Sequence, residues 1–175
     1  MCIVVDANAV AAVMSPRSAT HADFKPVHDW IVRGKGKLVY GGSTYEKEVF
    51  RRMPRYGGLI EELRRARKCV VLDHAAVDAA ERRVREAEPS PDFDDAHLIA
   101  IFEVSGCLLL CSDDARADRF VKNPALYERH APPSIYRLAE HRHLLRDENI
   151  AACCKPAERL SGPALSQIRE MLDGK

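Results

Sequence analysis

The chain has 175 residues, of which 46% are hydrophobic and 30% charged, and its formal net charge is +1. This length and composition fit one globular domain with a real core, and a charge near zero makes the surface as a whole neither attractive nor repellent to polyanions. No apolar run approaches the roughly 20 residues of a membrane span, and residues 1–10 lack a signal-peptide pattern, so we expect a cytoplasmic protein without membrane contact.

Short apolar runs alternate with helical patterns along the chain. Four runs have the β-branched and aliphatic composition of strands buried on both faces of a parallel sheet: residues 2–6, 37–42, 69–73 and 107–114. A fifth, shorter strand is expected at 134–138. Helical periodicity lies between these runs, at residues 7–14, 24–32, 43–53, 59–67, 75–88 and 90–104. The alternation predicts an α/β fold, with a mainly parallel central sheet in a three-layer α/β/α arrangement.

The last thirty residues differ from this pattern. After the breaker sequence at 161–163, an amphipathic helix is predicted at 163–172. We therefore divide the chain into a domain of residues 1–145 and a C-terminal helical appendage of residues 146–175.

Six cysteines lie without CxxC spacing, at Cys2, Cys69, Cys107, Cys111, Cys153 and Cys154. In a cytoplasmic protein they are expected to be buried, reduced thiols. A soft metal site formed by Cys153 and Cys154 with His141 and His143 is the less favoured alternative, because zinc ligands usually come in spaced pairs and adjacent cysteines are sterically awkward.

Arginines gather in four short clusters, at residues 51–55, 64–68, 82–85 and 142–146. The usual explanation of such clusters is a solvated helix face. The alternative is a rim that binds nucleic-acid phosphates without reading bases.

Acidic residues follow several predicted strands, at the edge where open α/β sheets form their ligand crevice. Asp6 ends the first strand and could either cap the next helix or take part in a site, and Asn8 could cap equally well. Asp73 ends the third strand with no acidic neighbour, so we expect it to be a helix cap.

Asp95 lies on the same helical face as the apolar residues Leu98, Ile99 and Phe102. A lone carboxylate buried there would be costly, whereas a divalent cation held by several carboxylates would offset that cost. Asp95 is therefore predicted to be functional, and Asp94 is predicted to cap the helix, with Asp92 as a second candidate cap.

The remaining acids leave two choices open. Either Asp113 or Asp114 can face the crevice while the other caps a helix, and Asp118 is expected to pair with Lys122 one turn later. Ser43 and Glu46 fit a capping box, which leaves Glu48 free for a site, although helical projection places Glu46 closer to the apolar face.

Four segments in order resemble the PIN-domain nucleases: VVDANAV at 4–10, the Glu48-Val49 pair, DDAHLIA at 94–100 and LLCSDD at 109–114. The resemblance favours Glu48 over Glu46 and covers residues 1 to about 145. It differs from the usual pattern in the extra residues of DARADRF (114–120), and it gives no role to residues 146–175.

The resemblance implies an endoribonuclease that depends on Mg²⁺ or Mn²⁺. Its catalytic acids would be Asp6, Glu48, Asp95 and Asp114, of which Asp6, Asp95 and Asp114 would bind metal, and Asn8 and Ser112 would support them by hydrogen bonds. RNA would be the substrate. The family also includes toxins that are silenced by a cognate antitoxin, and homodimers are common in it.

Two other functions compete with this hypothesis. A PIN-like module could bind RNA or a protein without catalysis, although all four acids are present. A phosphatase of the haloacid-dehalogenase type needs a second aspartate two residues after the first, where this chain has Asn8.

Overall fold

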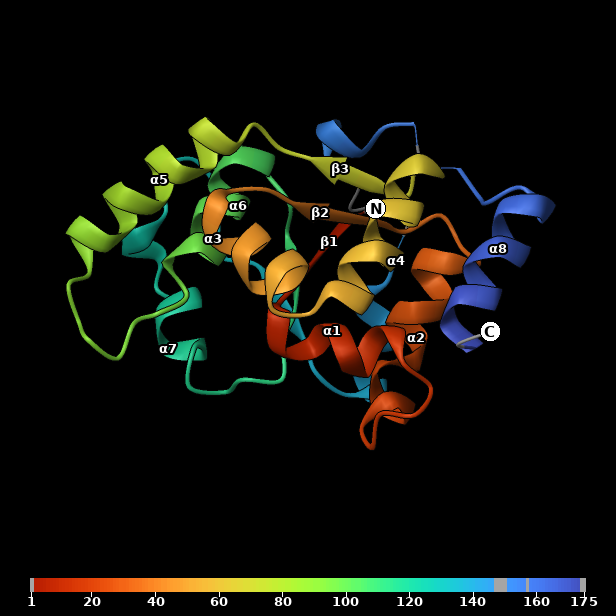
Figure 1. Cartoon of the computed structure of the whole chain (residues 1–175). Helices are drawn as coiled ribbons and strands as arrows, with labels where there is room; N and C mark the ends of the chain where they lie inside the picture. The colour runs from red at the N-terminus through yellow and green to blue at the C-terminus, as the bar shows by residue number, and fades with distance from the viewer. Residues whose placement is uncertain (1, 147–150, 157, 174–175) are drawn as a thin grey trace.

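Five parallel strands form one sheet in the computed structural model, which describes residues 2–146, 151–156 and 158–173 (Figure 1). In the order of the sheet, the strands are β3 (Cys69–Val71), β2 (Lys37–Tyr40), β1 (Cys2–Val5), β4 (Leu109–Cys111) and β5 (Ser134–Tyr136). Helices flank this sheet, which confirms the predicted α/β fold with a parallel sheet in three layers.

The middle of the sheet is fully buried. Every residue of β1 is buried, which explains why this strand is apolar throughout rather than alternating. Strand β1 pairs with β2 through Ile3 and Leu38, and with β4 through Val5 and Cys111. This register places the residues that follow β1 and β4 beside each other.

The helices begin and end close to the predicted positions. The longer ones are α1 (Ala7–Met14), α2 (His21–Val32), α4 (Pro54–Arg65), α5 (His74–Ala87), α6 (Ala96–Ser105) and α8 (Gly162–Asp173). Short helical segments complete the described chain: α3 (Ser43–Glu46), η1 (Lys47–Arg51), α7 (Asp118–Val121), η2 (Pro124–Leu126), η3 (Ala139–Leu144) and η5 (Ala152–Cys154).

The predicted helix at 43–53 differs most from the structure. It divides into α3 and the π-helical segment η1, and the predicted capping box is wrong. Gly42 takes the N-cap position with a φ of 85°, a conformation that suits glycine. The backbone N–H and hydroxyl of Ser43 both donate to the carboxylate of Asp78, at 2.7 and 2.6 Å, so a residue from α5 satisfies this helix end.

The C-terminal residues that the structure describes pack on the domain core. Helix α8 lies against α4, and its residues Ile168 and Leu172 belong to the same hydrophobic core as β1. Cys154 of η5 forms a disulfide with Cys2 of β1. The prediction that all six cysteines are reduced is therefore wrong for these two, because the fold brings together residues 152 positions apart in sequence.

Within the described ranges, none of the helices combines the length and the apolar composition that a membrane span requires.

Replacing Ile168 with alanine tests how firmly α8 belongs to the core. Ile168 is only 1% exposed, so Ile168→Ala should lower the free energy of unfolding by about 2–4 kcal/mol in urea denaturation. Arg169→Ala, an exposed neighbour on the same helix, is the control and should change it by less than about 0.5 kcal/mol. Equal, small effects of both changes would mean that α8 does not contribute to the core.

Candidate active site

The structure brings the four predicted acids to the carboxyl edge of the sheet. Asp6 directly follows β1, and Asp114 lies in the loop after β4. Asp95 occupies the N-cap position of α6, and Glu48 lies in η1. Asp95 experiences the negative charges of the other three, so the four carboxylates form one electrostatically coupled group.

Asp6 is held in place by the neighbouring strand. Its carboxylate accepts a hydrogen bond of 2.7 Å from the Ser112 hydroxyl, and its backbone N–H donates to the Cys111 carbonyl at 2.9 Å. Asp6 is 3% exposed, and burial raises its pKa, although the hydrogen bond from Ser112 partly offsets this effect. Although Asp6 occupies the N-cap position of α1, its side chain makes no capping hydrogen bond.

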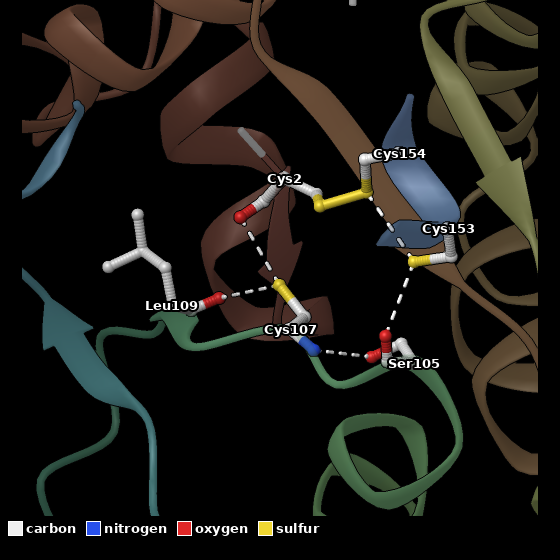
Figure 2. The surroundings of a disulfide bond; sticks show 6 residues. All are labelled: Cys2, Ser105, Cys107, Leu109, Cys153 and Cys154. Carbon is white, nitrogen blue, oxygen red and sulfur yellow. Dashed lines mark hydrogen bonds between the residues drawn. A yellow bond between two sulfur atoms is a disulfide. The ribbon is translucent and has the colours of Figure 1, made fainter. Parts of the chain in front are cut away.

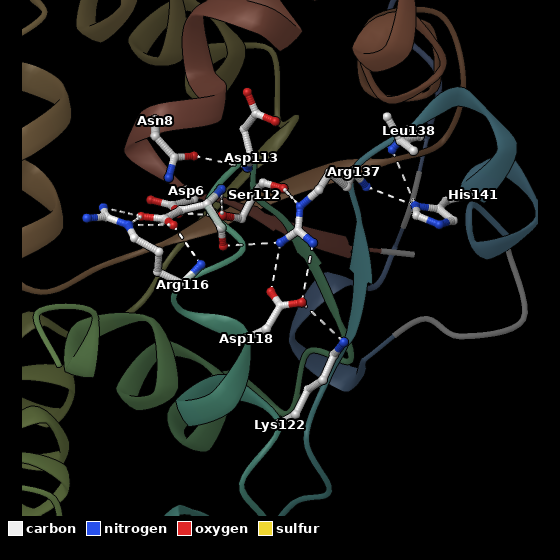
Figure 3. A network of polar contacts seen from close by, with 11 residues as sticks. Asp6, Asn8, Ser112, Asp113, Arg116, Asp118, Lys122, Arg137, Leu138 and His141 are labelled. Atoms are coloured by element: carbon white, nitrogen blue, oxygen red, sulfur yellow. Dashed lines mark hydrogen bonds and ion pairs between the residues drawn. The ribbon is translucent and has the colours of Figure 1, made fainter. Parts of the chain in front are cut away.

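Ser112 connects two of the acids. Besides donating to Asp6, its hydroxyl accepts the backbone N–H of Asp114 at 3.1 Å. Asn8 has a related role, because its side-chain oxygen accepts the backbone N–H of Asp113 at 3.2 Å. Ser112 thus contacts Asp6 and Asp114, whereas Asn8 contacts the backbone of Asp113, and Figure 3 shows Asn8 on α1 close to Ser112 of the loop after β4.

Asp95 has the most perturbed pKa of the group. Burial, followed by the charges of Asp6, Asp94, Asp114 and Glu48, raises it to about 7. Burial and the charge of Asp6 also raise the pKa of Glu48, while Arg52 partly offsets this. Three of the four acids, Asp6, Glu48 and Asp95, thus have raised pKa values.

Glu48, and not Glu46, belongs to the group of acids. Its Oε2 lies 3.5 Å from Nε2 of His97, and its side chain is 26% exposed. The side chain of Glu46 is 48% exposed, and its Oε1 lies 3.5 Å from Nε2 of His74 instead. The charge of Glu48 acts on Asp95 and that of Asp6 acts on Glu48, so the structure places Glu48 with the other acids; its catalytic role stays a prediction.

Asp114 faces the crevice, whereas Asp113 is exposed. The Arg116 guanidinium donates to the Asp114 carboxylate through Nε at 3.0 Å and Nη2 at 2.5 Å, and these hydrogen bonds hold the pKa of Asp114 below its usual range. The side chain of Arg116 is itself 87% exposed. One acid of the group is thus paired with the exposed side chain of a surface arginine.

The predicted caps have mixed outcomes. The Asp73 carboxylate accepts the Ala76 N–H at 2.7 Å, which confirms its role as the N-cap of α5. The prediction that Asp94 caps α6 is wrong, because Asp95 takes that position and makes no capping hydrogen bond. Asp92 instead pairs with Arg119 at 2.8 Å.

Asp118 pairs with Lys122 at 3.3 Å, as predicted, and also with Arg137 at 2.7 Å. Arg137 was not identified from the sequence. Its guanidinium also donates to the carbonyls of Ser112 at 3.2 Å and Asp114 at 3.1 Å, and thereby anchors the loop that carries Asp114 (Figure 3). The one sequence feature that could have indicated this contact is the position of Arg137 directly after β5, the strand next to β4.

His97 is the second residue that sequence reasoning missed. It is almost fully buried in α6, neither ring nitrogen has a hydrogen-bond partner, and burial lowers its pKa to about 4. It is therefore a neutral imidazole close to Glu48. Its position two residues after Asp95 was a usable signal, because helix α6 carries it toward the same edge of the sheet.

A cleft of about 640 Å³ opens beside Asp95 and Asp114. Acids and arginines both line it, together with a proline and two alanines: Pro91, Asp92, Asp94, Asp95, Asp114, Ala115, Arg116, Ala117 and Arg119. Neither arginine belongs to the clusters predicted from the sequence. Several arginines of those clusters pair with glutamates on helix faces, as Arg64 does with Glu61 and Arg85 with Glu81.

The donor set suits a hard divalent cation. Carboxylate oxygens are the ligands that Mg²⁺ and Mn²⁺ prefer. Burial first, and then the neighbouring negative charges, raise the pKa values of Asp95 and Glu48. Within the described ranges, however, no three of these acids place an oxygen within 4.8 Å of one another. Binding of one cation by three of them would require the side chains to move closer together.

No family model, curated protein or solved structure matches this chain. The likeness to PIN-domain nucleases therefore depends on the sequence motifs alone.

The raised pKa of Asp95 predicts an unusual dependence of stability on pH. An unfolded aspartate titrates near pH 3.9, whereas Asp95 in the folded protein titrates near pH 7. Between these values the folded state binds more protons, so stability falls as pH rises. With divalent metal chelated, Asp95→Asn should be more stable than the wild type at pH 8 by roughly 1–2 kcal/mol, allowing for partial solvent screening. The difference should vanish near pH 4.

Urea denaturation at pH 4, 6 and 8 measures this difference. A variant that is less stable than the wild type at pH 8 would show that Asp95 is not a repelled charge in the metal-free protein.

Arg137 should be important for the stability of the loop after β4. Arg137→Gln removes the contacts to Ser112, Asp114 and Asp118 and should lower the free energy of unfolding by about 2–3 kcal/mol. Lys122→Gln removes the other, exposed partner of Asp118 and should cost less than about 1 kcal/mol. Similar losses in both variants would argue against an anchoring role for Arg137.

Proposed function

We propose that this protein is a divalent-metal-dependent nuclease that hydrolyses RNA phosphodiester bonds. The observation that carries the proposal is the coupling of Asp95 with Asp6, Glu48 and Asp114 beside a cleft. Grouping four carboxylates in a partly buried place costs free energy unless a cation compensates for it. The motifs that resemble PIN-domain nucleases support the same function.

Asp6, Asp95 and Asp114 are the acids that would hold Mg²⁺ or Mn²⁺. Such an ion, when bound, lowers the pKa of water and stabilises negative charge on phosphate oxygens. Ser112 would hold the Asp6 carboxylate and the backbone of Asp114 close together through its two hydrogen bonds. Glu48, whose pKa is raised by burial and by the charge of Asp6, would accept a proton from the attacking water.

Arg116 and Arg119 would bind the substrate backbone. Both line the cleft with Asp95 and Asp114, and a guanidinium matches the geometry of phosphate oxygens. Arg116 currently pairs with Asp114, so phosphate and carboxylate would compete for it. Recognition through phosphates needs few contacts to bases, which fits a ribonuclease that acts on single-stranded regions.

The biological role that the resemblance suggests is the toxin of a toxin–antitoxin pair. The partners would then be RNA and a cognate antitoxin, and the protein could form a homodimer.

A non-catalytic PIN-like module that binds RNA or a protein is the second candidate. The pairing of Arg116 with Asp114 favours it, because this ion pair neutralises one of the expected metal ligands without a metal. The phosphatase alternative has less support, since Asn8 uses its side-chain oxygen to hold the backbone of Asp113.

Cleavage of a labelled single-stranded RNA tests the proposal. In Mg²⁺ or Mn²⁺ the wild type should cut the RNA, and a chelator should stop the reaction. Asp6→Asn and Asp95→Asn should each reduce the rate roughly 10²–10³-fold, the usual loss when one charged group of a hydrolytic site is removed. Asp29→Asn, on α2 and paired with Lys25 and Arg33, is the matched control and should retain full activity.

Each alternative predicts a different result. Equal cleavage by all four proteins would place the activity outside this site. RNA binding without cleavage, insensitive to Asp95→Asn, would favour the non-catalytic module.

A further inference from the structure

Three cysteine sulfurs meet at the amino end of the sheet, opposite the acids. The Sγ atoms of Cys2, Cys153 and Cys154 all lie within 4.8 Å of one another, and these three form the only such group of metal-binding side chains in the part of the chain that the structure describes. Cys2 begins β1, at whose other end Asp6 follows. Figure 2 shows the sulfurs gathered between β1 and η5.

The surroundings of the three sulfurs contain further soft or polar atoms. Cys2 and Cys154 are buried and joined by the disulfide, whereas Cys153 is an exposed free thiol whose Sγ lies 3.6 Å from that of Cys154. The Cys153 thiol donates to the Ser105 carbonyl at 3.3 Å. Cys107, another free thiol, donates to the Cys2 carbonyl at 3.2 Å, so a fourth sulfur lies at the same corner (Figure 2).

We propose that Cys2, Cys153 and Cys154 form a thiolate site for a soft divalent cation such as Zn²⁺ when the disulfide is reduced. Zinc–sulfur bonds of about 2.3 Å in tetrahedral geometry separate the sulfurs by about 3.8 Å. Cys153 and Cys154 already lie close to that separation. Only the bond between Cys2 and Cys154 has to open, and both residues stay positioned by the elements that carry them.

The chemistry requires a dithiol reductant. Its two thiols become a disulfide, and the two electrons and two protons that it gives up convert Cys2 and Cys154 to thiols. Binding of Zn²⁺ by the three cysteines then releases their three protons to solvent. The same residues are therefore either a disulfide with a neighbouring thiol or a metal site, depending on the redox state.

This site differs from the one considered from the sequence. His141 and His143 do not contribute, because His141 accepts backbone N–H groups of Arg137 and Leu138, and His143 lies 3.1 Å from the Glu140 carbonyl. Cys2 supplies the third ligand instead.

Spectroscopic titration with Co²⁺ tests the proposal on the full chain. The protein is reduced with a dithiol, separated from it without oxygen, and titrated with Co²⁺, which gives thiolate-to-metal charge-transfer absorption when sulfur binds it. We expect the charge-transfer absorption to saturate at one equivalent of Co²⁺ and Zn²⁺ to abolish it. Oxidised protein should show no such absorption.

Matched variants identify the ligands. Cys153→Ser and Cys154→Ser should each weaken binding at least about tenfold. Cys69→Ser is the control, since Cys69 donates to the Ile60 carbonyl elsewhere in the fold, and it should bind as the wild type does. Cys153→Ser can still form the disulfide, so near-ultraviolet circular dichroism of its oxidised form shows whether the fold is intact.

Two results would overturn the proposal. One is a folded, reduced protein without charge-transfer absorption. The other is binding that Cys153→Ser leaves unchanged, or that Cys69→Ser weakens equally. None of these readouts uses RNA cleavage, so the outcome is independent of the proposed nuclease activity.

Discussion

The hydrogen bond from Ser112 to Asp6 is the interaction on which the acidic edge of the sheet depends. It joins the ends of β1 and β4, whose register through Val5 and Cys111 places the two residues side by side. A buried carboxylate without a partner would be strongly unfavourable, and this hydroxyl supplies one without adding charge. Because the same hydroxyl accepts the Asp114 N–H, the position of the next acid follows from that of the first.

Grouping the acids is electrostatically unfavourable, and each acid has a different partner, or none, to stabilise its negative charge. Arg137 is partly buried and donates to two backbone carbonyls of the loop after β4, so its role is structural. Arg116 is exposed, so its ion pair with Asp114 is screened by water. Other anions can compete for Arg116, and cations can compete for Asp114. Asp95 has no such partner among the described residues, and its raised pKa reflects this. Under the proposed function, Asp95 is therefore the acid whose negative charge a bound cation would stabilise most.

The sequence predicts the features that depend on local periodicity. Continuous apolar runs indicated the parallel strands, and the acids after β1 and β4 were correctly placed at one edge because parallel strands end on the same side. Features that depend on distant contacts were missed. Ser43 is satisfied by Asp78 rather than by Glu46, and the disulfide joins Cys2 to Cys154 across most of the chain. Whether Asp94 or Asp95 takes the N-cap position of α6 depends on where the helix begins to within one residue, which local propensity does not determine.

Strand β1 connects the two proposed sites and also keeps them separate. Asp6 follows its carboxyl end and Cys2 begins it, yet the strand is paired on both sides, with β2 through Cys2 and Ile3 and with β4 through Val4 and Val5. These ladders fix its position along its own axis, so opening the disulfide should not displace Asp6 from Ser112. A change in redox state should thus act on the C-terminal residues and their metal affinity, while the acids keep the geometry that the sheet imposes.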